Sequence, residues 1–436
     1  MRKFLANLGI GIVLVAVAAL FAILPWIALV AIAVLLALWM AFGRRGRQAW
    51  SVTRVGMATI PQRLGSSSVV VIGIAGVVGV LVALLAMGEG FQATLMQTGS
   101  DDTVLVMRAG ANAELNSVLM HDSVVQIEQA PGILKDAKGL PIVSPELVVV
   151  ASLPRKGSGL DANVEIRGVG PQVWNLRPNV KITSGRKFTP GLRELIAGKG
   201  AEAQFAGLGL GSTIKLNNQV WTIVGTFDSG DAYDSDLWGD VDIVASTYRR
   251  GDSVTDAAVR LTSAGAFDAF KAALAANPQL TVDVQTTHDY FSKQSEGLTR
   301  LIRIVGGVVG TIMAIGAIFG ALNTMYAAVA TRAREIATLR AIGFRGLPVV
   351  VSVLLETMLL ALAGGVLGAA VAWLIFDNYT VSTLSQNFSQ VVFNFKVSPA
   401  LVLTGLKWAL VIGFVGGAFP ALRAARLPVT VALREQ

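Results

Sequence analysis

The chain has 436 residues, of which 53% are hydrophobic and 15% charged, and its mean hydropathy is +0.61. A soluble protein of this length is not so apolar, so the composition predicts an integral membrane protein. The net charge of +8 would suit nucleic acid, but most basic residues lie beside apolar runs, which indicates membrane topology. The absence of cysteine excludes thiolate metal sites and thiol catalysis.

The first apolar run, 5–42, is about twice as long as the roughly 20 residues that one helix needs to cross a bilayer. Pro25 lies near its midpoint, and basic residues flank both of its ends. These features favour a tight helical hairpin with both ends in the cytoplasm. The alternatives are one long kinked helix and a cleaved signal peptide, although the run is much longer than the apolar part of a signal peptide.

Four further apolar runs follow, at 69–87, 301–327, 347–376 and 401–422. With the hairpin they give six crossings and place both termini in the cytoplasm. The predicted fold class is an α-helical integral membrane protein with four core transmembrane helices, the N-terminal hairpin and an inserted α+β extracytoplasmic domain. The expected order is hairpin (1–43), cytoplasmic amphipathic segment (44–66), transmembrane helix (67–89), outer domain with stalk helices (90–300) and a membrane domain with three helices (301–436).

The outer domain has ordinary globular composition, with short β-branched runs between Asp, Asn, Pro and Gly. Two helices are expected, at 111–129 and 264–276, and a hairpin turn is expected at Asn217 and Asn218. Helices that continue from the membrane at 88–97 and 286–303 would form a stalk. Strands are expected at 103–108, 146–153, 163–168, 212–216, 219–227, 241–245 and 257–261.

Glycines recur in the apolar runs at intervals of three or four residues, which places them on one helix face and permits close packing of helices in lipid, some of it between two chains. Glycine is also simply common in membrane helices. For any one pair of glycines, this explanation has the same weight as a helix interface. The glycines concerned are Gly73, Gly76, Gly306, Gly310, Gly316, Gly320, Gly364 and Gly368.

Glu356 lies about nine residues into its span, roughly 13 Å along the helix. A carboxylate at that depth needs a partner or must be neutralised. A structural hydrogen bond to a neighbouring helix is favoured over a role in proton relay.

The segment 330–346 lies between the second and third core helices and is basic and amphipathic. Such a helix can lie at the membrane interface and offer a face to a partner, whereas the alternative is a loop whose arginines only fix topology.

No catalytic or metal signature is found. The aspartates between Asp228 and Asp242 do not fit a calcium-loop pattern and are expected to form a solvated loop. Neither His121 nor His288 lies in a catalytic signature, Ser184 lacks the nucleophile-elbow context, and no phosphate-binding P-loop occurs. We therefore expect no enzyme activity, no bound metal and no bound cofactor in this chain.

From about Arg54 to its end the chain resembles the permease subunits of MacB/FtsX-type ABC transporters, the class that includes the LolC and LolE permeases, without a fused ATPase. The most specific part is AREIATLRAIGF, 333–344, followed by Glu356 and by Gly364, Gly365 and Gly368. The ending at 416–435 is similar to the closing pattern of the family. The outer domain matches more weakly, through RGVGPQVW (167–174) and the region 207–224.

The resemblance implies two permeases in each complex and a separate pair of ATPase subunits, which would hold ATP and Mg. The second permease would be a copy of this chain or a paralogue, in a bacterial inner membrane, and a periplasmic adaptor and an outer-membrane channel would be further partners. The segment 330–346 would then dock the ATPase and carry coupling through Arg332, Arg334, Glu335, Ile336, Leu339, Arg340, Ile342 and Gly343. Within this set, Ile336, Leu339 and Ile342 would seat the segment against the membrane helices.

The leading hypothesis is a permease that uses a partner ATPase to move its outer domain and to export or extract a hydrophobic or periplasmic substrate. The alternative is a signalling scaffold whose outer domain activates a cell-wall hydrolase. The sequence identifies neither the substrate nor the second permease.

Overall fold

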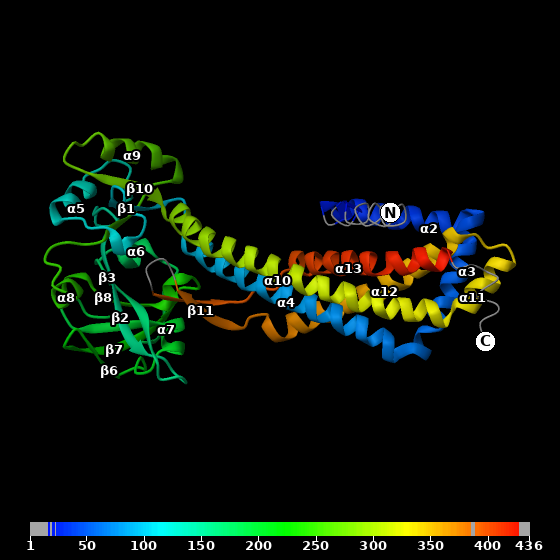
Figure 1. Ribbon diagram of the computed structural model, residues 1–436. Helices are drawn as coiled ribbons and strands as arrows, with labels where there is room; N and C mark the ends of the chain where they lie inside the picture. The colour runs from blue at the N-terminus through cyan, green and yellow to red at the C-terminus, as the bar shows by residue number, and fades with distance from the viewer. Residues whose placement is uncertain (1–15, 18–19, 22, 385–388, 427–436) are drawn as a thin grey trace, which may run out of the picture. The chain divides into compact units, whose positions relative to one another are not determined.

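The computed structural model describes residues 16–17, 20–21, 23–384 and 389–426 (Figure 1). The chain divides into two compact units. A helical unit comprises 1–87, 302–377 and 396–436, and a sheet unit comprises 88–301 and 378–395.

Within the described residues, four helices are long and apolar enough to cross a membrane, or five if the bent pair Trp26–Phe42 and Arg44–Ala58 is one span. The four are Ile60–Thr98, Thr287–Thr331, Gly346–Phe376 and Pro399–Arg426. They correspond to α4 (Leu64–Thr98) with the preceding 3-10 turn η1 (Ile60–Arg63), α10 (Thr287–Thr331), α12 (Gly346–Phe376) and α13 (Pro399–Arg426). Helices α4 and α10 each run without a break from an apolar span into a polar extension, as predicted for the stalk.

The second arm of the predicted hairpin is α2 (Trp26–Phe42), which begins after Pro25. Most of the first arm lies outside the described residues. Helix α2 ends at Gly43, and the chain bends by 100° into the amphipathic α3 (Arg44–Ala58). Helix α3 contacts both α12 and α2, and Gly46 lies against Trp39 of α2. The buried residues of α3 are Gly46, Ala49, Val52, Thr53 and Gly56.

The predicted glycines fall into two groups. A β-carbon placed on Gly364 or Gly368 of α12 would lie 2.6 or 2.3 Å from a backbone oxygen of α4, and Gly306 and Gly310 of α10 face Leu84 and Leu81. The second group consists of Gly73, Gly76, Gly316 and Gly320, where a β-carbon would meet no described atom within 4 Å. Only the first group therefore serves close packing within the described part of the chain.

The sheet unit contains one ten-stranded mixed sheet, in the order β10-β1-β9-β2-β3-β8-β5-β7-β4, with β6 paired to β7. Its pairs β3/β8 and β5/β7 are parallel. The strands are β1 (Thr103–Arg108), β2 (Val143–Pro154), β3 (Asp161–Val169), β4 (Lys181–Gly185), β5 (Glu194–Gly198), β6 (Thr213–Leu216), β7 (Gln219–Asp228), β8 (Asp236–Asp240), β9 (Asp256–Arg260) and β10 (Val282–Thr286).

Two hydrophobic cores lie on this sheet. One joins β1, β9 and β10 to α5 (His121–Glu128) and α9 (Phe267–Ala275), with Phe270 at its centre. The other joins the strands from β2 to β8 to α7 (Lys199–Gln204) and α8 (Val241–Thr247), with Trp221 fully buried. The short helix α6 (Val173–Leu176) follows β3.

A separate hairpin, β11 (Thr380–Leu384) with β12 (Gln390–Asn394), returns to the sheet unit from the chain between α12 and α13. The Val392 amide donates to the Ser235 hydroxyl at 2.8 Å, and Phe393 meets Phe91 edge to face. The predicted outer loop therefore adds the strands β11 and β12 to the sheet unit.

Three sequence predictions for this unit can be compared directly. The hairpin at Asn217 and Asn218 is confirmed, because both residues have positive φ, 41° and 69°, between β6 and β7. The strand predicted at 241–245 is wrong: Asp240 caps α8 by accepting from the amides of Asp242 and Ile243. The helix predicted at 111–129 is also wrong in its first half, where a 3-10 turn and a bridge at Leu119 precede α5.

Candidate functional site

The segment at 330–346 contains the short helix α11 (Ala333–Ala341), which follows α10 after a one-residue break at Arg332. Ile336 is 4% exposed and packs with Val329, Val353 and Ala421. Arg334, Glu335 and Thr338 are exposed on the other side, while Leu339 and Arg340 are half-buried. The helix thus has one face held by the helical unit and one face available to a partner.

The end of α11 differs from the prediction. Ile342 is 69% exposed, so it does not seat the segment against the described membrane helices. Gly343 has φ of +103°, and the amide of Phe344 donates to the Leu339 carbonyl at 3.0 Å. This is the usual hydrogen-bond pattern of a glycine-terminated helix, and it turns the chain toward α12.

Glu356 lies on α12 and is 3% exposed. Its Oε1 accepts from Arg63 Nη2 at 2.9 Å, and its Oε2 accepts from Arg332 Nη1 at 3.1 Å. We call Arg63, Arg332 and Glu356 the Glu356 clamp. Two guanidinium groups therefore supply the partner that a carboxylate in this position requires, which favours the structural reading of Glu356 over proton relay.

Sequence reasoning did not find Arg63 or its neighbour Gly56 as site residues. Arg63 belongs to η1, almost 300 positions before Glu356 in the sequence. A β-carbon on Gly56 would lie 3.1 Å from Arg332 Nη1 and 3.2 Å from Glu356 Oε2. The only signal in the sequence was the amphipathic character of the predicted cytoplasmic segment 44–66, which predicts a buried face but not its partner.

A second cluster of buried charge lies in the sheet unit around Arg167. This guanidinium, 2% exposed, donates to Glu114 and Glu165 at 2.7 and 2.6 Å and to Glu146 and Asp236 at 3.0 and 3.2 Å. Arg177 also pairs with Glu146, and its guanidinium lies over the Tyr233 ring. We call these residues, together with Asp256, the Arg167 cluster.

The Arg167 cluster corrects the interpretation of the aspartates between Asp228 and Asp242 as a solvated loop. Asp236 is 6% exposed on β8, and Asp231 is 5% exposed, with burial raising its pKa to about 6. Asp240 caps α8, and Asp234 accepts from the Ser229 amide. These side chains are therefore structural groups of the sheet unit.

Among the described residues the Arg167 cluster contains five carboxyl groups and two guanidinium groups, all buried. Glu146 and Asp256 lie directly opposite each other on β2 and β9, an unfavourable position for two negative charges. Asp256 Oδ2 has no donor in the described structure, and burial together with Glu114 and Glu146 raises the Asp256 pKa well above its ordinary value. A neutral Asp256 removes the repulsion between the paired Glu146 and Asp256 and lowers the excess of negative charge by one.

The carboxylate oxygens of Glu114, Glu146 and Asp256 also lie within 4.8 Å of one another, a spacing that a cation could use. Arg167 already donates to both glutamates, however, so a metal ion would have to lie close to a guanidinium charge. A protonated, neutral Asp256 fits this arrangement better than a metal ion.

We predict that Asp256→Asn reduces the pH dependence of stability. A carboxyl group whose pKa is raised by folding stabilises the protein fully below its unfolded pKa of about 3.9, and this contribution is lost as pH rises through the folded pKa. The free energy of unfolding of the wild type should therefore fall with rising pH by up to about 1.4 kcal/mol per unit from this proton, and the variant should lack this component. Thermal unfolding between pH 4 and 9 measures it.

The control is Asp268→Asn, on the exposed side of α9. In this variant the free energy of unfolding should change with pH as it does in the wild type. If the free energy of unfolding changed equally with pH in Asp256→Asn and in the wild type, the assignment of a proton to Asp256 would be contradicted.

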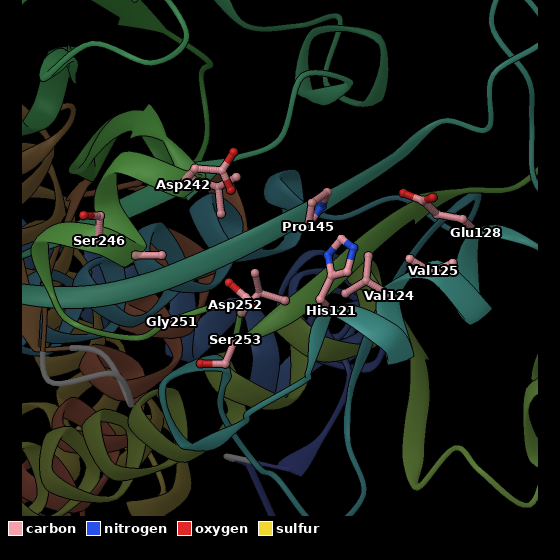
Figure 2. A pocket seen from close by; sticks show the side chains of 13 residues that line it. His121, Val124, Val125, Glu128, Pro145, Asp242, Ser246, Gly251, Asp252 and Ser253 are labelled. Carbon is pink, nitrogen blue, oxygen red and sulfur yellow. The ribbon is translucent and has the colours of Figure 1, made fainter.

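A cleft of about 720 Å³ opens in the sheet unit between α5 and α8. Figure 2 shows its side chains, among them His121, Glu128, Asp242 and Asp252, with valines along the wall. Burial raises the pKa of Glu128, and the charge of His121 opposes this shift. The cleft is acidic and partly apolar. Of its residues the sequence analysis considered His121, which lies in no catalytic signature, and Asp242, one of the aspartates expected in a solvated loop, and it predicted no site here.

Comparisons with known proteins agree with the resemblance found in the sequence. Residues 67–277 match the family model of the MacB-like periplasmic core domain, and 307–429 match that of the FtsX-like permease C-terminal domain. Helix α3 and η1 precede both matched ranges.

A relative from Bacillus subtilis, named as the uncharacterized ABC transporter permease YknZ, is 23% identical over 87% of this chain and 98% of its own length. The macrolide export ATP-binding/permease protein MacB of Bdellovibrio bacteriovorus is 25% identical over 84% of this chain, but the chain spans only 58% of that protein. The crystal structure of the periplasmic region of MacB from Actinobacillus actinomycetemcomitans covers 43% of this chain and 90% of its own, at 14% identity and a TM-score of 0.33.

Proposed function

Because this chain is an ABC transporter permease of the MacB/FtsX type, we propose that it couples ATP hydrolysis in a separate ATPase subunit to movement of its extracytoplasmic sheet unit. The observation that carries this proposal is α11, a short helix between two membrane spans with one face buried by Ile336 and one face exposed. The exposed face would dock the ATPase, and ATP and Mg would be held by that partner.

Charge distribution supports the orientation. Residues 88–301 contain 19 Lys and Arg against 24 Asp and Glu, whereas the helical unit holds most of the remaining basic residues beside its spans. Basic flanks remain on the cytoplasmic side, so α11 and both termini would be cytoplasmic and the sheet unit periplasmic, in a bacterial inner membrane.

Helices α4 and α10 offer a path for the movement. Each is a single helix that continues beyond its apolar span, by Gly88–Thr98 in α4 and Thr287–Leu301 in α10. A continuous helix transmits displacement along its axis because its backbone hydrogen bonds have no break. The moved sheet unit would then act on a hydrophobic or periplasmic substrate. The further partners would be a second permease, an adaptor and an outer-membrane channel.

The test is charge reversal at Arg334, on the exposed face of α11. Arg334→Glu is expected to lower stimulation of the partner ATPase by the permease by about tenfold, because a like-charge contact at a docking surface costs more than 1 kcal/mol. The measurement is ATP hydrolysis by the complex, reconstituted in nanodiscs after the ATPase has been identified by copurification. The matched control is Lys271→Glu on α9 of the sheet unit, which should behave as the wild type.

Full stimulation by Arg334→Glu would overturn the docking role of α11. Recovery of a periplasmic cell-wall hydrolase with the complex, in place of an adaptor, would favour the signalling scaffold over the exporter.

A further inference from the structure

We propose that Glu356 is a positioning residue for coupling, and that the segment α3–η1 belongs to the coupling element although it precedes both matched family domains. The proposal rests on the docking role of α11 proposed above. It adds a residue and a segment that hold α11 in place, and it follows from contacts within the helical unit.

The first contact fixes where α11 begins. Arg332 is the single residue between α10 and α11, and its backbone carbonyl accepts from the Ile336 amide at 3.0 Å. Its side chain, 11% exposed, bonds Glu356 through Nη1 and Glu335 through Nε, each at 3.1 Å. The start of α11 is thereby tied to α12 by a buried charge pair and to its own first turn by an exposed one.

The second contact brings in the segment before residue 67. Arg63 Nη2 donates to Glu356 Oε1 at 2.9 Å and to Thr59 Oγ1 at 3.1 Å. The guanidinium is therefore held both by α12 and by a residue of its own segment. A β-carbon on Gly56 would press against the side chains of Arg332 and Glu356, which would have to shift by a few tenths of an ångström. Glu356 thus connects α12 to the segment α3–η1 and to the α10/α11 junction.

The ion pairs of the Glu356 clamp lie among apolar side chains. Met325, Val329, Ile336 and Val353 line the small space around the three charges. Glu356 is itself buried among these apolar side chains, so removal of its carboxylate leaves two guanidinium groups facing each other without their shared counter-charge. We expect them to move apart, and Arg332 would carry the start of α11 with it.

The experiment uses the natural absence of cysteine in this chain. Cysteines replace Gln62 and Thr338, both exposed, and receive spin labels, so that the distance between η1 and α11 is measured in the full chain in nanodiscs. The doubly labelled chain without a further substitution should give one narrow distribution of distances between the two labels. Glu356→Gln should broaden this distribution and shift its mean. In the complex, the same variant should lower stimulation of the ATPase by about tenfold.

Two controls separate positioning from general damage. Thr357→Val removes a buried hydroxyl at the next position of α12, one that bonds only Val353 of the same helix, and it should leave the distance unchanged. Glu335→Gln alters the exposed docking face and should change stimulation without changing the distance. Because Arg63→Met leaves the Arg332 pair with Glu356 intact, it should fold and give intermediate broadening even if Glu356→Gln does not fold.

An unchanged narrow distance in both Glu356→Gln and Arg63→Met would overturn the inference, whatever the ATPase does. A broadened distance with full stimulation would support the clamp as the holder of α11 and would instead overturn the docking of the ATPase there.

Discussion

Replacement of Arg167 with methionine is expected to unfold the sheet unit near neutral pH. The guanidinium donates to four buried carboxyl groups, and its loss would leave them facing each other without a counter-charge. Removal of one partner from a buried pair typically costs about 3–5 kcal/mol, and here four pairs lose the same partner. Since a domain is stable by only about 5–15 kcal/mol, this change should remove most of the stability of the unit.

Limited proteolysis of the full chain in nanodiscs and the fluorescence of the buried Trp238, which lies beside Arg177, would report the unfolding. Arg186→Met is the matched control. Arg186 also pairs closely with a glutamate, Glu194, but its side chain is 55% exposed, so its loss should cost less than about 1 kcal/mol. Equal stability of the two variants would show that the Arg167 cluster is not the centre of the unit.

Substitution of Gly368 by alanine is expected to destabilise the helical unit. The new β-carbon would lie 2.3 Å from the Ala75 backbone oxygen of α4, a distance that no rotamer change can relieve. Helices α4 and α12 would have to separate, and overpacking of this kind costs about 1–3 kcal/mol. The midpoint of thermal unfolding in detergent should therefore fall.

Gly307→Ala on α10 is the control for helix propensity, because its β-carbon would meet no described atom within 4 Å. There alanine should stabilise the helix by up to about 1 kcal/mol, so the two glycine variants should shift the midpoint in opposite directions. A fall of equal size in both variants would contradict close packing as the reason for glycine at 368.

Local sequence signals identified some of the sheet unit well. Strand β1 was predicted with the bounds that it has, and the turn at Asn217 and Asn218 followed from the tolerance of asparagine for positive φ. Segment 241–245 failed because its β-branched residues favour a strand, whereas the preceding Asp240 caps a helix that packs beside β3 (Figure 1).

The Arg167 cluster could not be predicted from the sequence. Arg167 appeared only as the first residue of a stretch that resembles a known family. Its partners come from η2 (Glu114–Asn116), β2, β3 and β8, which become neighbours only in the folded sheet. Charged residues in a strand normally suggest an exposed face, and no local pattern shows that five carboxyl groups share one buried space.

The sequence by itself determined the membrane character, the inserted α+β domain and the amphipathic α11, because apolar length and periodicity are local properties of the chain. The tertiary structure decided which charges meet. It joined Arg63 to Glu356 and divided the glycines between packed and open faces. Contacts between residues hundreds of positions apart depend on how helices and strands pack. A sequence pattern specifies only which face of each helix or strand is buried.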